Sequence, residues 1–188
     1  VIRRLKGNMA VGHNRYSTTG EPSIKNVQPL YADIDTGGFA VAHNGNLTNA
    51  VDLRNRLVQN GSIFQSTSDT ECILQLIAKS KRPRVVERFV EALHDIEGAY
   101  ALVALTENMM IGARDPIGIR PFVLGESAGA MILASETCAL DMIGATFVRA
   151  VEPGEVVVVT RSKDGTVSIE SHFPFPRRKA RPCIFEFV

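Results

Sequence analysis

The sequence lacks a strong charge of either sign, a long apolar run and a dense set of cysteines. Its 21 basic and 20 acidic residues leave a formal net charge of +1, which gives no electrostatic basis for binding nucleic acid or an anionic membrane surface. No apolar run approaches the roughly 18 residues of a membrane helix, and no segment resembles a signal peptide. The three cysteines, Cys72, Cys138 and Cys183, are widely spaced, which indicates reduced thiols of a cytoplasmic protein rather than a disulfide framework.

The residues that most often bind metals or attack substrates also lack a functional pattern. The histidines show no metal-ligand spacing, so a zinc site is not expected. Cys72 falls inside a predicted helix and Cys138 in a short apolar one, so we interpret both as buried structural thiols. No nucleophile is therefore evident within the sequence.

The hydrophobic pattern predicts a layered α+β domain, for which 188 residues are sufficient. Helices are predicted at about 47–59, from Ser68 with a capping box formed by Ser68 and Glu71, and from Pro83 to Gly98. Short apolar runs predict the strands 9–13, 38–43, 100–106, 109–113, 122–125, 131–134, 147–150, 155–160 and 166–170, with a short helix at 136–142. The run 156–159 is apolar throughout, which indicates a strand covered on both faces.

Two loop motifs carry residues suited to binding an anion or an oxyanion. Gly12-His-Asn-Arg-Tyr-Ser-Thr-Thr-Gly20 contains Arg15, which suits bidentate binding of a carboxylate, although pairing with a structural acid explains it equally well. In His43-Asn-Gly-Asn46, the Gly45 N–H is expected near a helix start beside the Asn44 amide. These two donors suit a developing oxyanion, and a simple strand-to-helix connector is the alternative.

Two further motifs have structural interpretations. Asp69, within 66–71, falls in the first turn of a predicted helix, where any carboxylate is favoured; the functional alternative is a partner for a substrate ammonium group. The segments 114–121 and 134–141 contain a turn and charged residues, which we interpret as scaffold. Taken together, the motifs describe a pocket that binds a free α-amino acid undergoing acyl transfer.

The order of these motifs resembles the class II glutamine amidotransferases, whose glutaminase domain belongs to the N-terminal-nucleophile hydrolases. The segments Asp115-Pro-Ile-Gly-Ile-Arg-Pro121 and 134–141 resemble the glutamine phosphoribosylpyrophosphate amidotransferase branch of this class, and 181–188 resembles its passage into a phosphoribosyltransferase domain. The resemblance implies a four-layer αββα sandwich of two antiparallel sheets. It also divides the chain into a glutaminase domain at 1–172, shortened at its N-terminus, and a linker with the start of the missing domain at 173–188.

The resemblance assigns a role to each candidate site residue. It implies that Arg15 and Thr18 hold the glutamine α-carboxylate, and that Tyr16 shapes the pocket and couples it to the partner domain. It implies that Asp69 holds the α-amino group. It further implies that Asn44 and the Gly45 N–H form the oxyanion hole.

The resemblance also implies a nucleophile and partners that the sequence does not contain. The nucleophile of the family is an N-terminal cysteine, and the chain opens at Val1 without it, so the chain alone is expected to be inactive. No cofactor is expected in this chain; Mg²⁺ is expected in the phosphoribosyltransferase domain, and Cys183 stands where some relatives have a [4Fe–4S] ligand. L-glutamine is the expected substrate, and the intact enzyme is expected to be an oligomer of identical chains.

Two alternatives stay open at this point. The partner domain could be that of a glucosamine-phosphate synthase or an asparagine synthetase, which would change the ammonia acceptor. The domain could also bind glutamine without hydrolysing it, since the nucleophile is missing.

Overall fold

The computed structural model describes residues 7–15, 23–162 and 164–184, which form two antiparallel sheets and four α-helices. The larger sheet contains, in spatial order, β1 (Leu30–Ile34), β2 (Gly37–Leu47), β3 (Gly98–Leu105), β4 (Met109–Arg114), β8 (Val156–Arg161) and β9 (Val167–His172). The smaller sheet contains β6 (Ala130–Ala134), β5 (Val123–Ser127) and β7 (Thr146–Ala150). The helices are α1 (Ala50–Gln59), α2 (Thr70–Lys79), α3 (Val85–Asp95) and α4 (Thr137–Met142).

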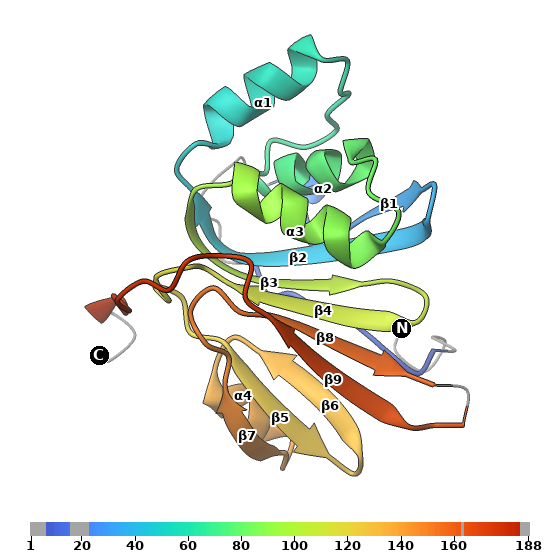
Figure 1. The fold of residues 1–188 in the computed structure, drawn as a ribbon, viewed down its shortest axis with the longest axis vertical. Helices are drawn as coiled ribbons and strands as arrows, with labels where there is room; N and C mark the ends of the chain where they lie inside the picture. Colours follow the sequence, from blue (N-terminus) through green and yellow to red (C-terminus); the bar gives the residue numbers. More distant parts are fainter. Residues whose placement is uncertain (1–6, 16–22, 163, 185–188) are drawn as a thin grey trace.

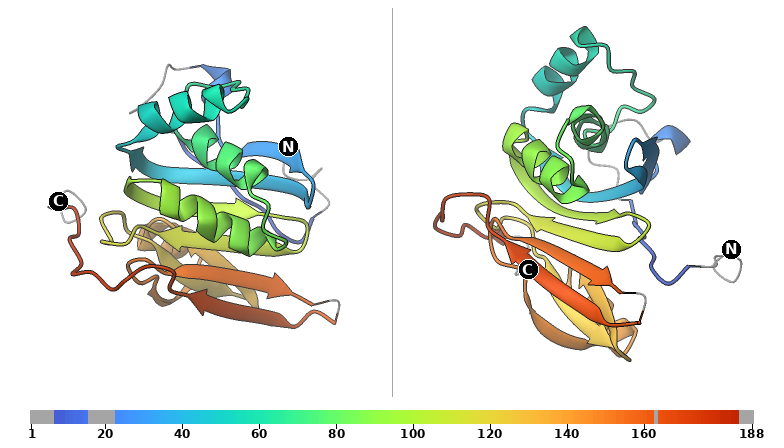
Figure 2. Two further views of the ribbon diagram at one scale, coloured as in Figure 1. Left: turned by 45° about the horizontal axis from the view of Figure 1, so that its top comes forward. Right: turned by 45° about the vertical axis from the view of Figure 1, so that its right-hand side comes forward.

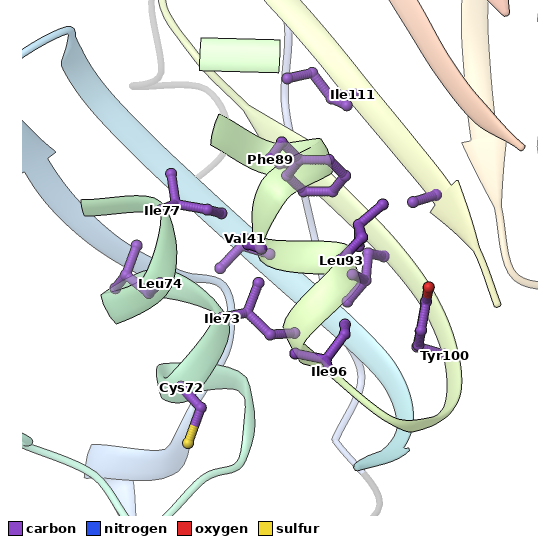
Figure 3. Packing of buried hydrophobic residues seen from close by; sticks show 14 of the residues in the cluster. Val41, Cys72, Ile73, Leu74, Ile77, Phe89, Leu93, Ile96, Tyr100 and Ile111 are labelled. Carbon is purple, nitrogen blue, oxygen red and sulfur yellow. The ribbon is translucent and has the colours of Figure 1, made fainter. Parts of the chain in front are cut away.

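Helices α2 and α3 cover one face of the larger sheet, and α1 packs against α2 (Figure 1). Ile73 and Ile77 of α2, with Phe89 and Leu93 of α3, belong to one apolar cluster with Val41 of β2 (Figure 3). All five side chains are at most 1% exposed. Burying an aliphatic or aromatic side chain of this size stabilises a fold by roughly 1.5–3 kcal/mol, so this layer supplies much of the stability.

A second apolar cluster joins the two sheets on the opposite face. Phe122 packs there with Val157 and Val159 of β8. Gly112 of β4 permits the close approach, because a Cβ at this position would lie 2.7 Å from Leu133 of β6 and 2.8 Å from Phe122. The neighbouring valines of β8 belong to the helix-side cluster, so the prediction of a strand covered on both faces is confirmed.

Helix α4 forms the outermost layer, beyond the smaller sheet (Figure 2). Its one buried side chain, Leu140, contacts β5 at Gly125, where an added Cβ would lie 2.6 Å from the leucine. The layers are therefore helices, six-stranded sheet, three-stranded sheet and helix. The predicted α+β sandwich of two antiparallel sheets is confirmed.

Two predicted elements are corrected at the N-terminal side. Residues 9–13 do not form a strand, because no described strand pairs with them. The strand β1 itself was not predicted, although its residues alternate between half-buried and exposed positions. The helix expected from Leu47 begins at Ala50, because residues 45–47 continue the pairing of β2 with β3. Among the described helices, none combines the length and apolar character needed to cross a bilayer.

Glu155, only 1% exposed, connects the two sheets at the start of β8. Its carboxylate accepts hydrogen bonds from the Arg149 guanidinium of β7 at 2.9 and 2.7 Å, from the Ser171 hydroxyl of β9 at 2.6 Å and from the Glu152 amide at 2.7 Å. Burial raises the pKa of Glu155, but Arg149, Ser171 and Glu152 outweigh this effect and hold the pKa below its ordinary value. The carboxylate is therefore ionised at neutral pH.

Glu155→Gln is expected to lower the free energy of unfolding by about 2–4 kcal/mol at pH 7, because the variant removes the charge that four donors surround. The folded-state pKa lies below the ordinary value of 4.5, so this contribution is complete above that pH and is lost as the pH falls through the folded pKa. Urea unfolding between pH 3 and 8 measures both effects. Glu170→Gln, at an exposed position of β9, is the control, and an equal effect of the two substitutions would contradict the prediction.

Candidate active site at the open edge of strand β2

One edge of β2 is open where β1 ends. Within the described residues, β1 pairs only with residues 37–41 of β2. Residues 42–47 of β2 therefore have β3 on one side and no described strand on the other. The His43 N–H donates to Gln28 Oε1 at 2.6 Å, and the Leu47 N–H donates to Asp69 Oδ2 at 2.9 Å. Alternate residues of a strand direct their N–H groups the same way. Gly45 lies between these two residues and therefore presents its N–H at this open edge.

The pairing on the other side of β2 supports the same orientation. Tyr100 of β3 is the register partner of Gly45, and its carbonyl accepts a hydrogen bond from the Asp115 amide at 2.9 Å, on the β4 side. Gly45 and Tyr100 therefore face each other as a non-hydrogen-bonded pair. The expectation that the Gly45 N–H lies at a helix start is wrong, because the strand continues to Leu47. The sheet edge, rather than a helix dipole, directs this donor outward.

Asp69 lies beside the same edge, at the start of α2, and is 9% exposed. One carboxylate oxygen accepts the Leu47 N–H, and the other lies 3.7 Å from His43 Nδ1. Burial raises the pKa of Asp69, but His43 and the amides of Leu47 and Thr70 outweigh this effect and hold the pKa below its ordinary value. The edge therefore carries a fixed anionic group two residues along the strand from Gly45.

The predicted capping box at the start of α2 does not form. The Ser68 hydroxyl accepts from the Thr70 amide at 3.3 Å, while the Glu71 carboxylate accepts the amides of Gln65 and Ser66, each at 2.7 Å. Asp69 occupies the N-cap position but makes no side-chain capping bond. Its carboxylate is thus directed toward β2, which weakens the purely structural interpretation of this residue.

Asn44 projects from the opposite face of β2 to His43, as strand alternation requires. Its Oδ1 accepts a hydrogen bond from the Arg120 guanidinium at 3.0 Å. Since arginine has only donors, the amide atom that faces it is the oxygen, and Nδ2 points away from Arg120. Sequence reasoning placed Arg120 in a scaffold segment and missed this contact, which joins residues 76 positions apart.

The remaining predicted site residues belong to the motif 12–20. His13 Nε2 lies 3.2 Å from the His43 carbonyl oxygen, which brings the start of this motif to the open edge of β2. Arg15 follows two residues later and is half-buried. Tyr16 and Thr18 lie outside the described residues. The structure thus places Asp69 and the Gly45 N–H at the same edge of β2, with Asn44 next to Gly45 in the strand and Arg15 close along the chain to His13.

Neither Cys72 nor Cys138 has the surroundings of a reactive thiolate. Cys72 is buried in α2, and burial raises its pKa to about 11. Cys138 is exposed, so the prediction that it is buried is wrong, and its hydrogen bond to Glu136 raises its pKa. Cys183 lies half-buried on the tail. Within the described residues, no group of three or more histidine, cysteine, aspartate or glutamate side chains could hold a metal ion.

Residues 13–142 match the family model of the glutamine amidotransferase domain. The chain belongs to this family. The match includes β1 to β6, the three large helices and the open edge of β2.

Known relatives of this glutamine amidotransferase domain place it in one branch of the family. The amidophosphoribosyltransferase of Rhizobium etli is 50% identical over the whole chain, which covers 38% of that protein. The chloroplastic amidophosphoribosyltransferase of Glycine max is also 50% identical, with 32% of it covered. The solved structure of glutamine phosphoribosylpyrophosphate amidotransferase from Bacillus subtilis superposes with a TM-score of 0.85 and 40% identity, over 93% of this chain and 37% of that one. The chain thus spans about a third of the length of these relatives, and the resemblance inferred from its motifs is confirmed.

Proposed function

We propose that this chain is the glutaminase domain of an amidophosphoribosyltransferase. Within the intact enzyme, this domain hydrolyses L-glutamine and supplies ammonia for the formation of phosphoribosylamine from phosphoribosyl pyrophosphate, in de novo purine synthesis. The main support for the proposal is the open edge of β2, where the Gly45 N–H follows Asn44 and the Asp69 carboxylate accepts the N–H of Leu47, two residues further along the strand. The family membership and the relatives' names support the same function.

Each site residue then has a defined contact with glutamine. The Asp69 carboxylate accepts the α-ammonium group, while Arg15 and Thr18 hold the α-carboxylate. Tyr16 shapes the pocket and couples it to the partner domain. Asn44 Nδ2 and the Gly45 N–H donate to the oxyanion that develops on the side-chain amide, and one such donor is worth about 2.7–4 kcal/mol of the barrier.

The nucleophile in this proposal is an N-terminal cysteine whose own α-amine acts as the base. An α-amine titrates at about 7.7–8.0, so it can accept the thiol proton and return it to the leaving ammonia. The sulfur forms a bond to the amide carbon, the C–N bond breaks, and water then hydrolyses the thioester to glutamate. The buried Cys72 and the exposed Cys138 do not suit this role, so we place the nucleophile outside these 188 residues.

The ammonia acceptor belongs to a second domain of the same polypeptide. We propose that residues 1–172 form the glutaminase domain and that 173–188 lead into a phosphoribosyltransferase domain, which needs Mg²⁺ for its pyrophosphate-containing substrate. Cys183 alone does not provide a [4Fe–4S] site, because such a cluster takes four cysteine ligands. The intact enzyme is proposed to be a cytoplasmic oligomer of identical chains, although several relatives are named as chloroplastic.

The full-length polypeptide that carries this domain and an N-terminal cysteine is expected to hydrolyse glutamine, and a glutamine-like alkylating agent is expected to abolish that activity. Changing Cys72, Cys138 and Cys183 together to serine should leave the rate of ammonia release unchanged, because none of them attacks the substrate. Coupled glutamate and ammonia assays measure both outcomes. Robust hydrolysis by the 188-residue chain itself would show that the nucleophile lies within it.

A further inference from the structure

The loop between β4 and β5 delivers one side chain to the candidate oxyanion site. The Arg120 guanidinium reaches back across the larger sheet to Asn44 Oδ1, and both side chains are half-buried. Neighbouring Asp115 and Arg114 are committed to the loop itself. The loop is therefore a support from which Arg120 extends toward β2.

Asp115 fixes the loop from within. Its side chain is fully buried, and its carboxylate accepts three backbone N–H groups at 3.2, 3.0 and 3.1 Å. These donors belong to Ile117, Ile119 and Arg120. Because one of the three is the Arg120 amide, the buried carboxylate sets the position from which the Arg120 side chain starts.

Two further sets of hydrogen bonds hold the outer side of the loop. The Arg114 guanidinium donates to three carbonyl oxygens at 2.7, 2.8 and 3.1 Å, those of Arg120, Val151 and Gly118. The tail beyond β9 donates from the Arg181 and Cys183 amides to the carbonyls of Ile117 and Ile119, at 2.7 and 3.4 Å. The bonds that fix the loop thus come from Asp115, Arg114 and the tail, and the contact of the Arg120 guanidinium with Asn44 is an addition to them.

We propose that Arg120 is a positioning residue for glutamine hydrolysis, which fixes the Asn44 amide with Oδ1 toward the guanidinium and Nδ2 toward the reacting carbonyl. This inference rests on the proposed function and deepens it, since it explains how the oxyanion donor is oriented. Arg120 acts through Asn44 and does not itself touch the substrate.

The physical need for such a residue follows from the symmetry of the asparagine side chain. The χ2 torsion of asparagine is broad and roughly two-fold, so an unrestrained amide presents its oxygen or its nitrogen with similar ease. An amide oxygen facing a developing oxyanion would repel it, whereas a donor fixed before the reaction stabilises it without reorganisation. A guanidinium can face only the oxygen, so Arg120 selects the productive orientation.

Arg120→Met in the full-length polypeptide keeps the apolar stem of the side chain and removes its donors. We expect kcat for glutamine hydrolysis to fall about 10- to 100-fold, somewhat less than the loss from removing an oxyanion donor, with KM changed by less than about threefold. Arg120→Lys restores a cationic donor and should recover part of kcat. If a thermal melt shows that Arg120→Met does not fold, Arg120→Ala replaces it. Unchanged kcat in a folded variant of either kind would overturn the proposal.

Arg161→Ala, at an exposed position at the end of β8, is the matched control and should leave kcat unchanged. Asn44→Ala separates the oxyanion site from the positioning role of Arg120, because unchanged kcat in that variant would overturn the proposed oxyanion site itself. A large loss in Asn44→Ala with none in Arg120→Met would overturn only the positioning role.

The double variant of Asn44→Ala with Arg120→Met completes the cycle. If Arg120 acts through Asn44, the double variant hydrolyses glutamine no more slowly than Asn44→Ala. Losses that multiply would overturn the proposal, since they would show that Arg120 acts independently of the amide.

Discussion

Replacing Gly45 with alanine is expected to lower the free energy of unfolding of this chain by about 3–5 kcal/mol and to abolish glutamine hydrolysis in the intact enzyme. The backbone of Gly45 has φ of +140°, a conformation that L side chains rarely adopt. An added Cβ would overlap the Ala99 carbonyl oxygen and lie 2.8 Å from its carbonyl carbon and 3.0 Å from His43 Nε2. The backbone of β3 cannot move aside as a flexible side chain would, so the two strands must separate locally.

Gly61→Ala is the matched control for this substitution. Gly61 also has a positive φ of +84°, but an added Cβ there meets no atom within 4 Å. Gly61→Ala therefore introduces backbone strain without any steric overlap, which costs about 1 kcal/mol. Urea unfolding of the two variants measures the difference, and ammonia release measures the activity. Equal losses of stability in the two variants would contradict the proposed close packing of Gly45 against β3.

Gly45 also shows where interpretation of the sequence alone ends. The motif identifies Asn44 and Gly45 as donors, but an Asn-Gly pair suits a turn, a helix start or a strand. The choice is made by the pairing of residues 45–47 with β3, whose residues lie more than fifty positions later. Local pattern therefore indicates candidate donors for an oxyanion, but its prediction that a helix start directs the Gly45 N–H is wrong.

The larger elements were easier to predict because their signals are local. The inward faces of α2 and α3 follow from helical spacing, and the doubly covered β8 follows from its run of valines. The segment 9–13 is equally apolar, yet it forms no strand, because none of the described strands pairs with it. The contact of Arg120 with Asn44 has no local signal at all, since only the packing of the loop after β4 brings the two together.

Asp69→Asn is expected to weaken glutamine binding about 10- to 150-fold while preserving the fold. Asparagine keeps the shape and one acceptor for the Leu47 N–H, so the hydrogen bond of 2.9 Å to β2 can persist. What disappears is the charge opposite the substrate ammonium, and a hydrogen bond to a charged group contributes roughly 1.5–3 kcal/mol. Asp95→Asn, in an exposed pair with Arg56, is the control and should leave binding unchanged.

A ligand without the α-amino group isolates this contact from every other one in the pocket. Glutaramate keeps the carboxylate and side-chain amide of glutamine but offers Asp69 nothing to bind, so the parent protein should strongly prefer glutamine. In Asp69→Asn that preference should largely vanish, because glutamine loses the partner of its α-ammonium group while glutaramate loses nothing. Calorimetry with both ligands measures the preference. Since the pKa of Asp69 lies below its ordinary value of 3.8, the parent's preference should hold at neutral pH and decline only as the pH falls through that lowered pKa. If Asp69→Asn prefers glutamine over glutaramate as strongly as the parent does, the ammonium group does not bind at Asp69. The open edge of β2 would then bind glutamine in a different orientation.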